Sequence, residues 1–194
     1  MTGILIALAA IPISAVLWGV FTGRWSAESR ASRKLQADTA AVNPAMRFPV
    51  PWVFILAYIA GVAVQHFVPL AIHSPDVSRA MRVGGFVLVG VGILVAFSAL
   101  GIFKRASTTT VPFEKPSTLV TSGPYRFSRN PMYVALTLVY LGVAGTRNEI
   151  WPLILLPLVL VYVNFLVIPF EERRLDDVFG EAYQAYGARV RRWL

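Results

Sequence analysis

Residues 150–170 read IWPLILLPLVLVYVNFLVIPF, a run of 21 residues that contains no charged side chain. A helix of about 20 apolar residues is long enough to cross the ~30 Å hydrocarbon core of a bilayer. Apolar residues that cluster into such long blocks are typical of membrane proteins. This stretch therefore predicts a membrane-spanning helix.

Four further apolar blocks precede this one, at about residues 4–21, 50–70, 83–103 and 132–145. Hydrophobic residues make up 56% of the chain and charged residues only 14%. Soluble domains have about a quarter charged residues, so this chain has too little polar side chain to cover a water-facing globule. We predict an all-α integral membrane protein with five transmembrane helices. The fourth block is short and lies close to the fifth, so these two spans are expected to form a tight helical hairpin.

Basic residues are concentrated in alternate connections between the blocks. The segments after the first, third and fifth blocks each contain five Lys or Arg residues, whereas those after the second and fourth contain two and one. Cytoplasmic segments carry the excess of Lys and Arg, so we expect the N-terminus outside and the C-terminus, with a final helix, in the cytoplasm. The predicted organisation is an N-terminal two-span region (1–80) with a cytoplasmic loop (22–49), followed by a core (81–194) that contains spans three to five and the C-terminal cytoplasmic segment.

The remaining composition restricts the class of function. The net charge of +8 is accounted for by this topology and by contact with anionic headgroups, so we expect no nucleic-acid partner. The chain has no cysteine and only two histidines, His66 and His73, which argues against a metal site. The short chain and its content of Ala, Val and Arg suggest a protein of a prokaryotic inner or plasma membrane.

Two polar segments flank the predicted hairpin. Residues 123–133 read GPYRFSRNPMY, in which Asn130 and Pro131 suit the N-cap and the first turn of a helix. Glu171 and Glu172 follow the last apolar block directly. Because the hairpin begins and ends on the same side, both segments are expected to meet at the cytoplasmic face. Carboxylates at a membrane boundary are costly unless paired and mark candidate functional sites; simple pairing with nearby arginines is the plainer alternative.

These segments resemble a known family, the isoprenylcysteine carboxyl methyltransferase and phospholipid methyltransferase superfamily, over roughly residues 85–194. The resemblance rests on the run Leu119 to Tyr133, the pair Glu171-Glu172, and Phe179-Gly180 with Tyr183 and Tyr186. It implies an integral membrane enzyme that uses S-adenosylmethionine as methyl donor and releases S-adenosylhomocysteine. It also implies a cytoplasmic pocket that the C-terminal segment caps, and a lipophilic acceptor that arrives from the bilayer.

The resemblance further implies roles for individual residues. The nucleoside part of the cofactor would contact Leu119, Val120, Gly123 and Tyr125, and its polar end would contact Arg129, Asn130, Tyr133, Glu171 and Glu172. Pro124 and Pro131 complete the expected cofactor-binding set. Arg129, Glu171 and Glu172 are the expected catalytic residues. Many members have histidine where this chain has Asn130, and asparagine does not titrate near neutral pH, so only a binding role is expected there.

The chemistry of the sulfonium donor agrees with these residue types. Acidic side chains suit its ammonium group, and Arg129 beside a helix N-terminus suits its carboxylate. The acceptor stays open: a prenylated-cysteine carboxylate needs no general base, whereas a phospholipid amine needs one, for which Glu171 or Glu172 is the candidate.

Two alternatives belong to other classes of protein. The first is a membrane enone or sterol reductase that uses NADPH; those enzymes tend to have Gly-Glu after the tyrosine, where this chain has Val134-Ala135. The second is a non-enzymatic membrane scaffold, which leaves the polar segments at both ends of the hairpin unexplained.

Overall fold

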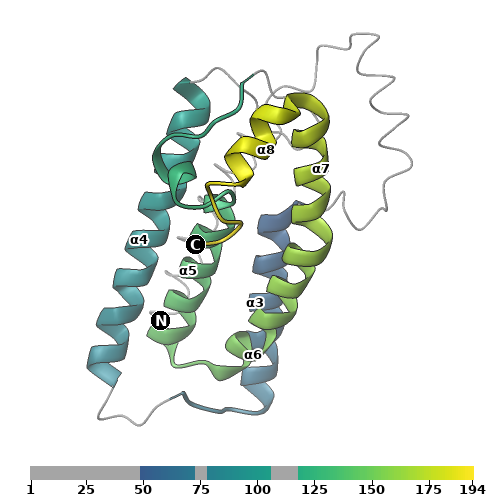
Figure 1. Cartoon of the computed structure of the whole chain (residues 1–194). Helices are drawn as coiled ribbons and strands as arrows, with labels where there is room; N and C mark the ends of the chain where they lie inside the picture. Colours follow the sequence, from purple (N-terminus) through teal and green to yellow (C-terminus); the bar gives the residue numbers. More distant parts are fainter. Residues whose placement is uncertain (1–48, 73–77, 106–117) are drawn as a thin grey trace, which may run out of the picture.

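The computed structural model describes residues 49–72, 78–105 and 118–194. Within these ranges every regular element is helical. The first predicted span, residues 4–21, and almost all of the predicted loop at 22–49 lie outside the described residues. Figure 1 shows the long helices running side by side, with the short helix α8 at one end of them.

The helices follow the apolar blocks that the sequence predicts. In chain order they are α3 (Val50–Phe67), α4 (Ser78–Arg105), the 3-10 turn η3 (Gly123–Arg126), α5 (Pro131–Arg147), α6 (Ile150–Tyr162), the π-helical turn η4 (Val163–Val167), α7 (Ile168–Phe179) and α8 (Glu181–Gly187). Among the described residues, three helices are long and apolar enough to cross a membrane: Val50–Phe67, Arg79–Lys104 and the continuous helix Ile150–Phe179. The described part of the chain is thus all-helical and agrees with an integral membrane protein.

The fourth predicted span corresponds to α5, which is short. It has 17 residues, and at 1.5 Å per residue its length is about 26 Å, slightly less than the hydrocarbon core. Pro131 occupies its first turn, where the missing N–H costs nothing. Asn148 ends it in the left-handed conformation with φ 58°. Since α6 begins at Ile150, the connection of the predicted hairpin is tight.

The two arms of this hairpin each pack on a different neighbour. α5 packs chiefly on α4, and α6 packs chiefly on α3, whereas α5 and α6 make few contacts with each other. In Figure 1 the continuous helix α6–η4–α7 runs alongside α3, on the other side of α5 from α4. The hairpin therefore has a tight connection but separated arms, which the sequence does not predict.

Glycines allow α4 and α5 to approach closely. A Cβ atom added to Gly85 would lie 2.7 Å from the Gly142 carbonyl oxygen, and one added to Gly92 would lie 2.8 Å from the Ala135 carbonyl oxygen. Such small residues are common where transmembrane helices cross. Gly85 and Gly92, both in the third apolar block, therefore belong to the contact between α4 and α5. At Gly90, by contrast, no atom of the described residues lies within 4 Å of an added Cβ.

A polar cluster joins α3 to the hairpin connection, at the end away from α8. Glu149 is only 7% exposed, and its carboxylate accepts hydrogen bonds of 2.8 Å from Tyr58 Oη and from Arg147 Nε. Because a buried carboxylate is costly unless it is paired, this cluster fixes α3 against the start of α6. The other end of the helices is where the predicted site residues lie.

Candidate active site

The turn before α5 is built around a glycine. Gly123 has φ 59°, a conformation that glycine adopts at little cost, and a Cβ atom there would collide with Ile102 Cδ1 of α4. The turn η3 then buries Tyr125, whose ring meets Phe103 edge-on at 5.3 Å between centroids. Gly123 and Tyr125 therefore dock the turn on α4, and this fixes where Arg129 and α5 begin.

Asn130 lies at the N-cap position of α5, as predicted, but its side chain does not cap the helix. Its amide Nδ2 donates to the Arg192 carbonyl at 2.9 Å, and its own N–H donates to Ser128 Oγ at 3.0 Å. Ser128, which is 2% exposed, also donates to the Arg192 carbonyl at 3.3 Å. The Asn130 side chain therefore bonds to the backbone at Arg192 and does not cap α5.

The two glutamates have different partners. Glu171 Oε1 accepts a 2.6 Å hydrogen bond from Tyr133 Oη on α5. Glu172 forms ion pairs with Arg129 at 3.2 Å and with Arg192 at 2.6 Å. Arg192 binds both oxygens, because its Nε also donates to Oε1 at 3.0 Å. The structure therefore brings Arg129, Tyr133, Glu171 and Glu172 together, and it adds Arg192 to them.

Arg129 retains one unused donor. Its backbone N–H donates to the Arg191 carbonyl at 2.9 Å, and its side chain pairs with Glu172. Its Nε is buried and has no hydrogen-bond partner among the described residues. A Cβ atom added to Gly187 would lie only 3.2 Å from Arg129 Nη1, so α8 closes over the guanidinium group at a glycine. A buried donor without a partner is uncommon and is consistent with a ligand that accepts from it.

Helix α8 covers the site through two buried tyrosines. Gly180, with φ 50°, ends α7 and begins α8. Tyr186 Oη donates to the Tyr125 carbonyl at 2.7 Å, and Tyr183 packs beside it. Burial, with Tyr183 nearby, raises the pKa of Tyr186 to about 12, so its hydroxyl stays protonated and remains a donor. These two tyrosines therefore pack α8 against the turn η3.

The other predicted cofactor residues precede or begin the elements just described. Leu119 and Val120 are half-buried in irregular backbone ahead of η3. The Pro124 carbonyl accepts from the backbone N–H groups of Phe127 and Ser128 at 3.1 and 3.2 Å. Pro124 belongs to the same turn as Gly123 and Tyr125, and among the described interactions Leu119, Val120 and Pro124 make no direct contact with the two glutamates.

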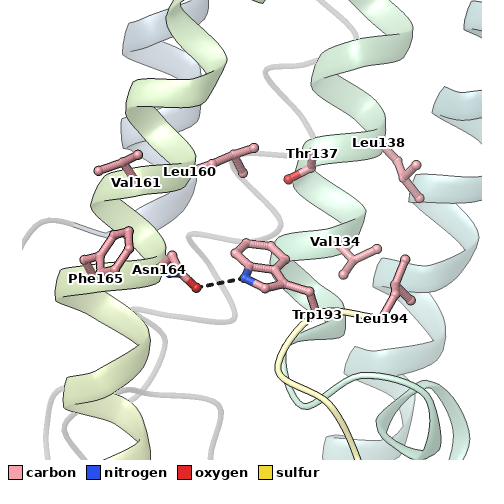
Figure 2. A pocket seen from close by; sticks show the side chains of 9 residues that line it. All are labelled: Val134, Thr137, Leu138, Leu160, Val161, Asn164, Phe165, Trp193 and Leu194. Carbon is pink, nitrogen blue, oxygen red and sulfur yellow. Dashed lines mark hydrogen bonds between the residues drawn. The ribbon is translucent and has the colours of Figure 1, made fainter.

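A cavity of about 580 Å³ lies between α5 and α6, beside the polar site. Its walls are formed by nine residues of α5, α6, η4 and the last two positions: Val134, Thr137, Leu138, Leu160, Val161, Asn164, Phe165, Trp193 and Leu194. Figure 2 shows the Trp193 indole between the two helices, where its Nε1 donates to Asn164 Oδ1 at 3.0 Å. The lining is largely apolar.

Sequence reasoning missed three of these residues. Arg192 is one of fifteen basic residues that the charge pattern assigns to topology, so nothing in the sequence separates it from the others. Trp193 does not belong to any of the motifs on which the family resemblance rests. Asn164 is different, because it is the single amide side chain in the run 150–170, and polar residues inside apolar spans mark candidate functional sites.

The described helices and this site define a class: a helical membrane protein with an arginine–carboxylate site at one end of its spans and an apolar cavity next to it. The sequence profile of the phospholipid methyltransferase family matches residues 80–182, from α4 into α8. The match covers more than half of the chain, which therefore belongs to that family. Comparison with curated proteins and with solved structures gives no match.

Membership confirms the resemblance drawn from the sequence motifs. It implies a membrane methyltransferase, and methyltransferases of this type typically use S-adenosylmethionine. The match favours this activity over the reductase and scaffold alternatives. Within the described residues, no group of three or more His, Asp or Glu side chains is arranged to hold a metal ion.

Proposed function

We propose that this protein transfers a methyl group from S-adenosylmethionine to the amine of a membrane phospholipid. The observation that carries the proposal is the Arg129–Glu172 ion pair, with Glu171 beside it, inside the segment that matches the phospholipid methyltransferase family. An isoprenylcysteine-type carboxylate is the other acceptor that the family resemblance allows, and the experiment below separates the two.

The residues present fit the proposed cofactor. Its amino-acid end carries a carboxylate and an ammonium group. The buried and unpartnered Nε of Arg129 suits the carboxylate, and the negative charge of the acidic pair Glu171–Glu172 favours the ammonium group. When bound, S-adenosylmethionine supplies an electrophilic methyl group on a positively charged sulfur. Leu119, Val120, Gly123, Pro124, Tyr125, Asn130, Pro131 and Tyr133 are proposed to complete the binding site.

The two glutamates are proposed to act differently. Glu172 is held by Arg129 and Arg192, so it positions the arginines and the end of the chain. Among the described residues, the Tyr133 hydroxyl is the one hydrogen-bond partner of Glu171, and Glu171 is the base that takes the ammonium proton of an amine acceptor. Once that proton is on Glu171, the amine lone pair is free to form the new N–C bond as the S–C bond breaks. Alignment of the two reactants supplies much of the rate.

We also propose five spans, with the N-terminus outside and the site in the cytoplasm of a prokaryotic cell. The alternating Lys and Arg content of the connections supports this orientation, and α5 is counted as a short fourth span. On this arrangement residues 1–80 are the N-terminal two-span region, residues 81–194 are the methyltransferase core, and α8 lies at the cytoplasmic surface.

Three measurements on the full chain in phosphatidylcholine nanodiscs test the proposal. S-adenosylhomocysteine, and not NADPH, should bind in a calorimetric titration. Tritiated methyl groups should pass from S-adenosylmethionine to phosphatidylethanolamine. The label should resist base, because base releases methanol from a methyl ester but leaves an N-methyl group intact; transfer to N-acetyl-S-farnesylcysteine with base-labile label would select the carboxylate acceptor instead.

A pair of matched substitutions assigns the base. Glu171→Gln should abolish methyl transfer to the amine, whereas Glu181→Gln, an exposed glutamate at the start of α8, should leave it unchanged. Absence of both S-adenosylhomocysteine binding and methyl transfer to either acceptor would refute the proposed function.

A further inference from the structure

The cavity between α5 and α6 is suited to a hydrocarbon chain. Its volume of about 580 Å³ falls in the range of small-molecule sites. Val161 and Phe165, which line it, are 54% and 69% exposed and belong to a helix that is apolar enough to cross a membrane. The edge of the cavity therefore lies where lipid chains would surround the protein.

Asn164 places a polar group in this apolar lining. It lies in η4, the π-helical turn, and π-helical turns are frequent at functional sites. Its Oδ1 accepts the Trp193 indole N–H at 3.0 Å (Figure 2). An amide inside a membrane span is costly unless it is paired, so this hydrogen bond accounts for the position of the indole.

Fewer interactions hold Trp193 and Leu194 than hold Arg192. Up to Arg192 the end of the chain is held firmly, because the Arg192 carbonyl accepts from Asn130 and the Arg192 side chain binds both oxygens of Glu172. Trp193 adds one hydrogen bond and apolar contacts, and Leu194 is 73% exposed. Local opening is cheapest where few interactions hold the chain, so Trp193 and Leu194 are the part that is able to swing away.

Trp193 lines the cavity and directly follows Arg192, which binds Glu172 of the polar site. In Figure 2 its indole reaches across the space between α5 and α6, next to Asn164 and Val134. Val134 follows Tyr133 directly, and Glu171 is seven residues beyond Asn164, about 10 Å along the helix. A lipid whose chain lies in the cavity and whose amine reaches Glu171 would therefore extend past the indole.

We propose that Trp193, held by Asn164, is a gate that an amphiphilic acceptor must open before its head group reaches the site. The inference rests on the proposed function for the identity of the acceptor. With the hydrogen bond made, the cavity is closed off from Glu171. With the bond broken, Trp193 and Leu194 swing away, and the head group passes. The family match ends at residue 182, so the gate comes from a part of the chain outside it.

Enzyme kinetics test the gate through two conservative variants. Asn164→Leu removes the acceptor of the hydrogen bond, and Trp193→Phe removes the donor while keeping an aromatic ring. Loss of one hydrogen bond shifts the closed state toward the open state about fivefold, and the apparent affinity of a ligand follows the open fraction. The KM for phosphatidylethanolamine in phosphatidylcholine nanodiscs should therefore fall up to about fivefold in each variant. The double variant should match the single ones, because both remove the same bond, and the Kd for S-adenosylhomocysteine should not change.

A structural measurement tests the gate without methyl transfer. The chain has no cysteine, so spin labels are attached at Leu194→Cys and at Leu158→Cys, an exposed α6 residue outside the cavity lining. In pure phosphatidylcholine nanodiscs the two labels should show a single distance between them. Addition of phosphatidylethanolamine should produce a second distance between the labels. Asn164→Leu should show the second distance without phosphatidylethanolamine.

The outcomes separate the two ideas. Distances that respond neither to phosphatidylethanolamine nor to Asn164→Leu overturn the gate, even in an active methyltransferase. A KM that is unchanged or raised in both variants also overturns it. A second distance in a protein that transfers no methyl group supports the gate and refutes the proposed function alone.

Discussion

Replacing Arg192 by glutamine removes the charge that holds the end of the chain over the site. Arg192 contacts Glu172 through two hydrogen bonds, at 3.0 and 2.6 Å. The two side chains are 35% and 18% exposed, so the pair is neither a fully exposed one, worth up to about 1 kcal/mol, nor a fully buried one. Hydrogen bonds to charged groups contribute about 1.5–3 kcal/mol. Arg129 stays on Glu172 and keeps that carboxylate paired, so we expect a loss of about 2 kcal/mol.

This loss should appear as exposure of the backbone that the chain end protects. The Arg129 N–H donates to the Arg191 carbonyl at 2.9 Å, and that bond depends on the docked end. A change of about 2 kcal/mol is about a 30-fold change in an equilibrium. Hydrogen exchange at the Arg129 amide should therefore become about 30-fold faster in Arg192→Gln. Binding of S-adenosylhomocysteine should also become weaker, so its Kd should rise.

Arg191→Gln is the matched control, because the Arg191 side chain is exposed and only its carbonyl takes part in the contact. It removes the same charge from the adjacent position and should leave both measurements within about twofold of wild type. Equal effects of the two variants, or unchanged exchange at Arg129 in Arg192→Gln, would show that net charge near the membrane, and not the bond to Glu172, holds the chain end.

Three further predictions concern the packing and the site. Gly92→Val forces a side chain against the α5 backbone and should destabilise the protein by about 1–3 kcal/mol in denaturant titrations. Among the described residues no group lies within 4 Å of a Cβ added to Gly90, so Gly90→Ala should change stability by less than about 0.5 kcal/mol; equal effects of the two variants would rule out the close contact at Gly92. Tyr133→Phe removes the donor to Glu171 and should lower kcat/KM for methyl transfer about tenfold, so wild-type kinetics would show that this bond does not matter. Gly123→Ala adds a side chain at φ 59° against α4 and should lower the free energy of unfolding by about 1–2 kcal/mol or more; a wild-type Tm would contradict the close contact.

Hydropathy predicts where the helices of this fold lie, but not how they pair. The block at 50–70 becomes α3, and the block at 83–103 lies inside α4. These elements follow from local composition, because a run of apolar residues forms a helix in a membrane whatever its neighbours are. Which helices pack together depends on which helix faces carry small residues and fit one another in shape. The contact of Gly85 with Gly142 decides it for α4 and α5, and hydropathy does not distinguish those glycines from Gly90.

For the candidate site, too, the sequence predicts which segments meet but not which side chains pair. The sequence predicts that Arg129 meets the two glutamates, because a hairpin brings its two ends to one side. It does not predict that Glu171 and Glu172 take separate partners, since adjacent residues on a helix point about 100° apart and the neighbours of each are set by packing. Arg192 is hidden by the arginines around it. Asn130 has the right residue type for capping, but the nearby carbonyl of Arg192 competes for its amide.

The π-helical turn η4 has a consequence for the direction in which the glutamates point. A π turn holds about one residue more than an α turn, and each residue turns the chain about 100° around the helix axis. The extra residue rotates Glu171 and Glu172 by that angle relative to the part of the helix that packs on α3. A regular α-helix through Val163–Val167 with the same number of residues would keep the hydropathy, the glutamate pair and the motif at 119–133. It would turn the carboxylates away from Tyr133 and Arg129, leaving a membrane protein that has every motif of the family and no assembled site.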